Sequence, residues 1–247
     1  MTDFPRGFAF MLEGLGLIQR PRLRRFVLIP LLVNLLLFAG LLYVAYGWFQ
    51  QLMAVVTDWL PAWLDWLQYL LWPLLAISAL LIIFYSFTLV ANLIAAPFNG
   101  LLAEAVERHL TDQPLPGAES WKQLLKELPA TLLAEAQKLL YFVLWAIPVG
   151  LAFLIPGLNL FAPFLWALFS AWMLALEYLD PPLGNHGLLF KAQRARARER
   201  RLLTLGFGTG AMLMTLVPVL NFIAMPAAVA GATALWVKGM KGQGQAE

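Results

Sequence analysis

The chain has 247 residues, of which 61% are hydrophobic and 13% are charged, and its mean hydropathy is +0.74. Soluble domains carry about 25% charged residues, so the composition excludes an ordinary soluble domain. The long apolar runs predict an all-α integral membrane protein with a single membrane domain. The absence of cysteine excludes disulfides, thiolate metal sites and a cysteine nucleophile.

Residues 1–25 predict an interfacial helix followed by a basic segment at the membrane surface. Residues 1–19 combine large apolar side chains with few charges, as in an amphipathic helix that lies at the interface. We expect this helix to end at Gly14 and Gly16 or at Pro21. The basic segment that follows contains four arginines: Arg20, Arg22, Arg24 and Arg25.

These arginines have two possible roles. Basic residues beside a first membrane helix hold that end in the cytoplasm. The start of a helix also offers unpaired backbone N–H groups and the positive end of the helix dipole, and neighbouring guanidinium groups add charge and forked donors. The arginines therefore either orient the chain or also form an anion site.

Residues 26–95 predict two long transmembrane helices, Val27–Trp48 and Leu71–Ala95. The first is too long for a signal-peptide core and lacks a cleavage site, so we expect it to be retained. Asn34 in the first helix and Asn92 in the second are polar groups at membrane depth. Each either pairs with a neighbouring helix or lines a pore.

The segment between these helices, residues 49–70, contains two aspartates, no Lys or Arg, and tryptophans at helical spacing. This pattern favours a helix on the outer surface with an aromatic belt.

Residues 96–138 predict a charged cytoplasmic segment. The sequence Pro97-Phe98-Asn99-Gly100 is a helix-breaking pattern, and two amphipathic helices should follow it, Leu101–Leu110 and Trp121–Leu139. Glu104 and Arg108 are four residues apart and should face each other on the first of these helices. The pair is either a solvated surface pair or a functional pair beside the membrane exit.

The last half of the chain contains a repeated helical hairpin. Residues 139–179 and 202–237 each form two apolar arms around an uncharged Pro-x-Leu-Asn tip, with corresponding positions 62 residues apart. Asn159 in one tip matches Asn221 in the other. Because the final arms are about 16 residues long, we expect both hairpins to be half-inserted, with the Asn side chains satisfying backbone groups in the buried tips. Six full spans is the alternative.

The basic residues predict the orientation of the chain. All 17 Lys and Arg lie before the first long helix, within 101–138, within 180–201 or in the tail, 238–247. Both termini should therefore be cytoplasmic, and the hairpins should enter from that side. The run from Lys191 to Arg201 should set topology and meet anionic lipid headgroups. Its position beside the membrane argues against nucleic-acid binding.

Several blocks of the sequence resemble the CysZ sulfate permeases of bacterial inner membranes. They are residues 21–34 (PRLRRFVLIPLLVN), 95–104 (AAPFNGLLAE), 169–175 (FSAWMLA) and the stretches around Met225-Pro226 and Gly231–Ala234, together with Asn185-His186 and Phe190-Lys191. The resemblance covers nearly the whole chain. It implies sulfate uptake for cysteine synthesis, two transmembrane helices with two half-inserted hairpins, and assembly into a homo-oligomer.

The resemblance also implies a site for the sulfate ion. The family has a Gly-hydrophobe-Arg-Arg motif ahead of the first long helix, and here Leu23, Arg24 and Arg25 match three of its positions, while Arg22 stands where glycine is usual. Glycine there would allow a close approach of the backbone to the anion. A compensating role for the Arg22 guanidinium and crowding by its side chain are both open.

Three function classes follow from the sequence. The first is a sulfate permease, with candidate pore or gating residues Glu104, Arg108, Asn34, Asn92, Asn99, Asn159 and Asn221. The second is a membrane scaffold or assembly protein, in which these asparagines only join helices. The third, an enzyme, is disfavoured because the two histidines are isolated and no nucleophile motif is present. We expect no cofactor and no metal.

Overall fold

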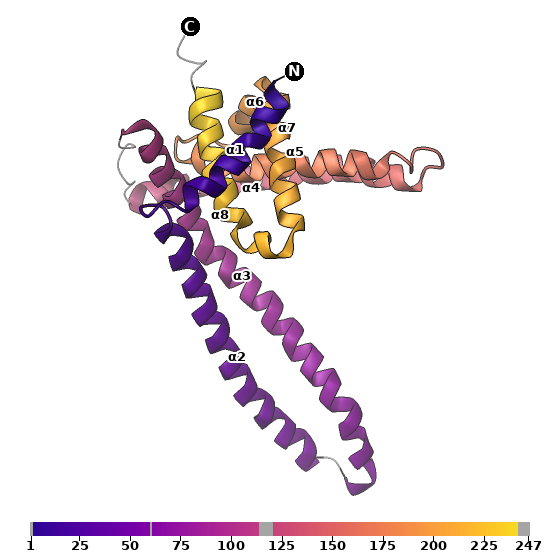
Figure 1. Cartoon of the computed structure of the whole chain (residues 1–247). Helices are drawn as coiled ribbons and strands as arrows, with labels where there is room; N and C mark the ends of the chain where they lie inside the picture. The colour runs from indigo at the N-terminus through magenta and orange to yellow at the C-terminus, as the bar shows by residue number, and fades with distance from the viewer. Residues whose placement is uncertain (1, 60, 114–120, 242–247) are drawn as a thin grey trace. The chain divides into compact units, whose positions relative to one another are not determined.

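The computed structural model describes residues 2–59, 61–113 and 121–241, with the backbone alone for residues 62, 65, 86, 88–96 and 121–128. Every regular element in these ranges is helical, which confirms the all-α prediction (Figure 1). The α-helices are α1 (Asp3–Ile18), α2 (Arg25–Trp59), α3 (Gln68–Thr111), α4 (Trp121–Leu151), α5 (Ala162–Gly184), α6 (Phe190–Glu199), α7 (Arg201–Leu216) and α8 (Pro218–Leu235). The short helical turns are η1 (Ala62–Leu67), η2 (Ala152–Leu154) and η3 (Trp236–Met240).

Five helical segments in the described part of the chain are long and apolar enough to cross a membrane. They are Arg25–Trp59, Gln68–Tyr85, Pro129–Leu154, Ala162–Gly184 and Pro218–Met240. The protein is therefore a multi-pass membrane protein. Arg201–Leu216, at 16 residues, is shorter than these segments.

The chain divides into two compact units, and the division falls inside α2 and α3. The smaller unit, Leu28–Phe98, consists of the long parts of these two helices, which run antiparallel to each other (Figure 1). Phe38 contacts Phe87 with ring centroids 4.9 Å apart, and Phe49 contacts Trp72 at 5.0 Å. Large apolar side chains on both helices are exposed, as expected for surfaces that face lipid.

Two predicted helix boundaries are wrong, the end at Trp48 and the break at Pro97–Gly100. Of the two ends expected for the first helix, α1 runs through Gly14 and Gly16 and stops at Ile18, shortly before Pro21. α2 extends to Trp59, so that residues 49–59 belong to the first long helix. α3 passes through Pro97–Gly100 and includes the predicted helix Leu101–Leu110. An internal proline removes one helical hydrogen bond, whereas a full break at membrane depth would leave several backbone groups unpaired in lipid.

The predicted helix Trp121–Leu139 likewise continues without a break into the first arm of the first hairpin, and together they form α4.

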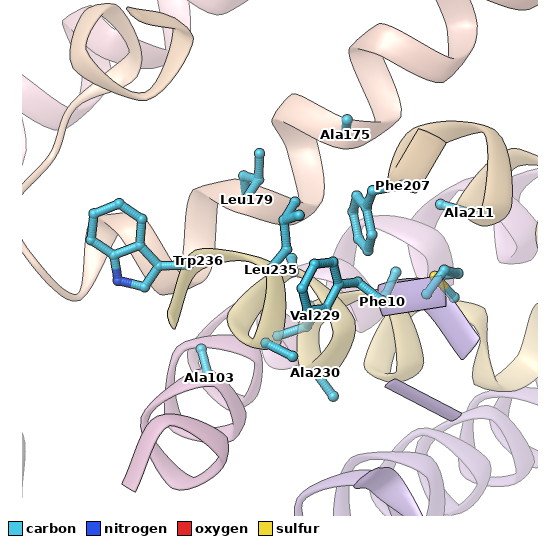
Figure 2. Close-up of a cluster of buried hydrophobic side chains, with 14 of the residues drawn as sticks. Phe10, Ala103, Ala175, Leu179, Phe207, Ala211, Val229, Ala230, Leu235 and Trp236 are labelled. Atoms are coloured by element: carbon cyan, nitrogen blue, oxygen red, sulfur yellow. The ribbon is translucent and has the colours of Figure 1, made fainter. Parts of the chain in front are cut away.

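The larger unit contains Met1–Val27 and Asn99–Glu247, and its core forms where α1 packs against α7 and α8. Figure 2 shows Phe10 of α1 beside Phe207 of α7 and Val229 of α8. Glycines permit this close packing: a Cβ added at Gly14 would overlap the carbonyl oxygen of Ala227. A Cβ at Gly206 would overlap the carbonyl oxygen of Phe4. Small residues that bring helix backbones into contact are typical of membrane helix packing.

The two hairpins repeat at the backbone level. Ile155 and Val217, which are 62 residues apart, both adopt an extended conformation, with φ −90°, ψ 118° and φ −90°, ψ 112°. Each precedes a proline, which disfavours helical backbone at the residue before it. The tips then differ, because Gly157 takes a positive φ of 84° and a turn leads into α5, whereas α8 begins directly at Pro218.

Candidate functional site

The arginine-rich segment between α1 and α2 forms a tight turn anchored by one buried side chain. Leu23 is 2% exposed and belongs to the apolar core of the larger unit. The backbone N–H groups of Leu23 and Arg24 both donate to the carbonyl oxygen of Arg20, each at 2.9 Å. Because Leu23 points inward, the neighbouring side chains of Arg22 and Arg24 are exposed on either side of it.

The turn leaves several cationic donors without an acidic partner. Among the described residues, none of the guanidinium groups of Arg20, Arg22, Arg24 and Arg25 forms an ion pair. The guanidinium of Arg25 lies over the ring of Phe26, 4.9 Å from its centroid. Stacking of this kind holds a guanidinium in place and leaves the N–H groups at its edge available.

The backbone offers fewer free donors than the start of a helix would suggest. The N–H groups of Phe26 and Val27 donate to the carbonyl oxygens of Leu23 and Arg24, at 3.0 and 3.1 Å. Within the described chain, the N–H groups of Arg22 and Arg25 have no hydrogen-bond partner. We expected the first helical turn to offer several backbone donors to an anion. Only the N–H groups of Arg22 and Arg25 in this turn are free in the described chain.

Glu104 and Arg108 form the predicted ion pair near the end of α3. Their side chains are 34% and 58% exposed. Exposed pairs of this kind contribute about 0.3–0.5 kcal/mol in a helix, so the pair itself adds little to stability.

Glu107, one helical turn after Glu104 on α3, has a buried carboxylate that the sequence pattern did not predict. The side chain of Glu107 is 3% exposed, and its carboxylate lies 2.8 Å from Nε2 of His186 and 2.8 Å from Nζ of Lys241. The ring of Trp236 lies 5.6 Å from that of His186. Glu107 thus joins the end of α3 to the loop after α5 and to the end of η3.

Sequence spacing could not predict this cluster, because Glu107, His186 and Lys241 are separated by at least 55 residues. The one sequence feature that pointed to this cluster was Asn185-His186, which is among the residues that resemble the family. Asn185 contacts the same helix as His186 does, since its Nδ2 donates to the carbonyl oxygen of Gly100 at 2.9 Å.

Each candidate asparagine with a described side chain has its own surroundings. Oδ1 of Asn34 is buried without a hydrogen-bond partner among the described residues. Nδ2 of Asn99 contacts Sδ of Met225 at 3.8 Å. The side chain of Asn92 lies outside the described residues.

Asn159 and Asn221 are exposed at the two hairpin tips. Their backbone N–H groups donate to the carbonyl oxygens of Ile155 and Val217, at 3.0 and 2.9 Å. In the described part of the chain their side chains make no hydrogen bond to the freed backbone groups of the tips, contrary to our expectation.

Two further polar clusters lie at the ends of helices in the larger unit. Nζ of Lys138 lies 3.2 Å from a carboxylate oxygen of each of Glu135, Glu177 and Asp180. At the start of α1, Arg200 binds Asp3 with two hydrogen bonds, of 2.7 and 3.1 Å. These hydrogen bonds lower the pKa of the Asp3 carboxyl below its ordinary value of 3.8.

Among the described residues, no group of three or more His, Cys, Asp or Glu side chains could hold a metal ion. The fold and the site define a helical, multi-pass membrane protein with an exposed, unpaired cationic turn ahead of its first long helix.

The family described as "Sulfate transporter CysZ/Etoposide-induced protein 2.4" matches residues 10–226. Because the match spans most of the chain and includes both long helices and the arginine turn, the protein belongs to this family. The resemblance to CysZ that the sequence motifs indicated is confirmed.

Proposed function

We propose that this protein is a sulfate permease of the bacterial inner membrane, which takes up sulfate for cysteine synthesis. The observation that carries the proposal is the arginine turn. In the described chain, the guanidinium groups of Arg22, Arg24 and Arg25 and the backbone N–H groups of Arg22 and Arg25 have no acidic or carbonyl partner there. Family membership supports it, since the family description names a sulfate transporter. Such a function needs no cofactor.

The chemistry of the turn suits a doubly charged oxyanion. Sulfate is strongly hydrated, so its site must replace water with several hydrogen-bond donors at once. Arg24 and Arg25 supply forked, permanently charged donors. The Arg22 and Arg25 N–H groups lie in the same turn and offer the backbone contacts that helix starts give to anions. Buried Leu23 holds the turn in place, and Arg22 stands at the position where the family resemblance implies glycine.

The proposed topology has both termini in the cytoplasm and both hairpins half-inserted from that side. Charged residues limit the depth of each hairpin: the uncharged part of α5 before Glu177 is Ala162–Leu176, and that of α7 after Arg201 is Leu202–Leu216. Each segment is about 22 Å long at 1.5 Å per residue. The hydrocarbon core is about 30 Å thick, so these uncharged parts are too short to cross it, although the whole helix Ala162–Gly184 has the length of a span.

A passage for sulfate needs polar groups at membrane depth and charged groups at its exit. Asn34, Asn92 and Asn99 on the long helices are proposed for the first role, with Asn159 and Asn221 at the tips. Glu104 and Arg108 are proposed for the second.

Assembly into a homo-oligomer would complete such a passage. The family resemblance of the sequence blocks supports such an assembly. Oδ1 of Asn34 is buried within its own chain without a partner among the described residues. Burial of this kind favours the second candidate function, a membrane scaffold whose asparagines only join helices. Binding of sulfate distinguishes the two candidates.

Calorimetry of the purified protein in detergent tests the site. A charge-assisted hydrogen bond contributes roughly 1.5–3 kcal/mol, so Arg24→Ala and Arg25→Ala should each weaken sulfate binding by about ten- to a hundredfold. Arg20→Ala is the matched control and should bind normally. Arg22→Gly should bind as well or better if the backbone contact dominates, and worse if the Arg22 guanidinium is a ligand. Equal, small losses in all four variants would contradict a specific site.

A further inference from the structure

Helix α6 has one packed face and one basic flank. Phe190, Gln193 and Ala197 are buried against the rest of the larger unit. At about 100° per residue, Arg194 and Arg198 lie within about 60° of Lys191 around the helix axis, so that these three side chains form a single stripe. Lys191 and Arg198 are exposed, and none of the three has an acidic partner among the described residues.

The acidic groups near α6 do not neutralise this stripe. Glu199 pairs with Arg196, at 3.3 Å, on the opposite flank of the helix. Nε2 of Gln193, on the packed face, donates to Asp180 at 2.6 Å. The carboxylate of Asp180 also lies 3.2 Å from Nζ of Lys138.

Aromatic side chains place the stripe at the depth of lipid headgroups. The guanidinium of Arg194 lies over the ring of Tyr141, 5.0 Å from its centroid. The hydroxyl of Tyr141 accepts a hydrogen bond of 3.1 Å from Nε1 of Trp172, and Trp145 lies 6.4 Å from Tyr141. Tyr and Trp side chains gather at the boundary between headgroups and hydrocarbon.

An exposed apolar surface continues from this point along α4. Leu140 and Leu144, on either side of Tyr141 in the sequence, are 58% and 60% exposed. A ligand that fills both surfaces must carry a negative charge at one end and a hydrocarbon chain at the other. A soluble anion or a nucleic acid would leave the apolar surface uncovered.

We propose that the stripe formed by Lys191, Arg194 and Arg198 binds the phosphate headgroup of an anionic phospholipid, with its acyl chains along α4. A guanidinium stacked on an aromatic ring keeps its edge donors free for phosphate oxygens. This site is separate from the arginine turn before α2 and does not depend on sulfate transport.

The test uses the full chain in an uncharged detergent and measures lipid binding by native mass spectrometry. The probes are phosphatidylglycerol and phosphatidylcholine with identical acyl chains. A basic residue at an anionic membrane surface contributes about fivefold in affinity. Phosphatidylglycerol should bind more tightly than phosphatidylcholine, and Arg194→Gln and Arg198→Gln should each weaken its binding about fivefold.

Arg196→Gln is the matched control, because it removes a charge from the opposite flank of the same helix, and it should bind phosphatidylglycerol normally. Arg198 is exposed, so its substitution should leave the fold intact. Equal affinity for the two lipids, or an equal loss in Arg196→Gln, would overturn the proposal. Displacement of phosphatidylglycerol by glycerol 3-phosphate alone would also overturn it, because that result would indicate a site for a soluble phosphate.

Discussion

The two hairpins of the larger unit share an extended residue before the tip proline but differ in their surroundings. In α7–α8, α1 covers the arms, and most of α8 is buried. In α4–α5, large side chains such as Leu144, Leu160 and Phe164 are exposed, at 60%, 71% and 74%. The repeated sequence therefore specifies the extended residue before each tip, whereas the side chains along the arms determine how much protein or lipid surrounds each hairpin.

Side-chain size explains this difference. The arms of α7 and α8 are rich in glycine and alanine, which allow α1 to approach at backbone distance. The exposed sides of α4 and α5 carry leucine, phenylalanine and tryptophan, which gain nothing from leaving lipid for another helix. The other side of α5 carries Ala171 and Ala175, against which Gly208 of α7 packs at backbone distance. Lys138 and three carboxylates join the bases of α4 and α5.

The largest expected effect is in chemical labelling of the two hairpin tips. Both tips are predicted to lie in lipid, and a tip either reacts with a reagent from outside or does not. Leu160 and Phe222 occupy equivalent positions in the two tips and are 71% and 78% exposed in the protein alone. Since the chain has no cysteine, Leu160→Cys and Phe222→Cys each introduce one thiol. If both tips lie in lipid, an impermeant thiol reagent added from outside should label neither.

Arg198→Cys, at a cytoplasmic position in this account, is the control for labelling and should react only after the cells are opened. Ready labelling of both tips from outside would indicate six full spans.

The second prediction concerns the close packing of α1 against α8 in the second hairpin. In Gly14→Ala the added methyl group overlaps the carbonyl oxygen of Ala227 and the backbone of Gly231, and overpacking of this kind costs about 3 kcal/mol. Gly16→Ala is the matched control in the same helix, because nothing lies within 4 Å of its added methyl group. It should stabilise α1 by about 0.5–1 kcal/mol. Thermal unfolding in detergent measures both, and equal effects would contradict the close approach.

A smaller effect is expected where the bases of the two hairpins meet. Glu107→Gln removes the buried charge that binds His186 after α5 and Lys241 after η3. We expect a loss of about 1–2 kcal/mol, because the side chains of His186 and Lys241 both remain partly exposed to solvent. Glu104→Gln, in the exposed pair on the same helix, should cost only about 0.3–0.5 kcal/mol. The ranking would be wrong if the two variants unfolded at the same temperature.

The smallest effect is a pH dependence at the start of α1. Arg200 lowers the pKa of Asp3 below 3.8 in the folded protein, so the ionised form is favoured by folding. The stabilisation should be complete above about pH 5 and should be lost as the pH falls through the lowered pKa. Asp3→Asn removes this dependence, and the difference in unfolding temperature between it and the natural chain should shrink on acidification. A constant difference would contradict this assignment.

The sequence predicted what depends on local pattern and could not predict what depends on tertiary contacts. The helical class, the 62-residue repeat and the Glu104–Arg108 pair follow from periodicity and spacing, and the structure contains each of them. A helix break was misplaced at Pro97, and of the two ends expected for the first helix Gly14 does not end it, because proline and glycine lie there within continuous helices.

The buried role of Glu107 depends on partners that come from distant parts of the chain. Its neighbour Glu104 has the same charge and lies on the same helix, yet it is solvated. Only the packing of α3 against the loop after α5 distinguishes the two carboxylates.

The central claim is that this chain alone carries sulfate across a membrane through the arginine turn. Uptake of isotopically labelled sulfate into vesicles that contain only the purified protein tests it most directly. The natural chain and Arg20→Ala should take up sulfate, whereas the double variant Arg24→Ala, Arg25→Ala should fall to the level of empty vesicles. Absence of uptake by the correctly inserted natural chain, or unchanged uptake by the double variant, would contradict the account.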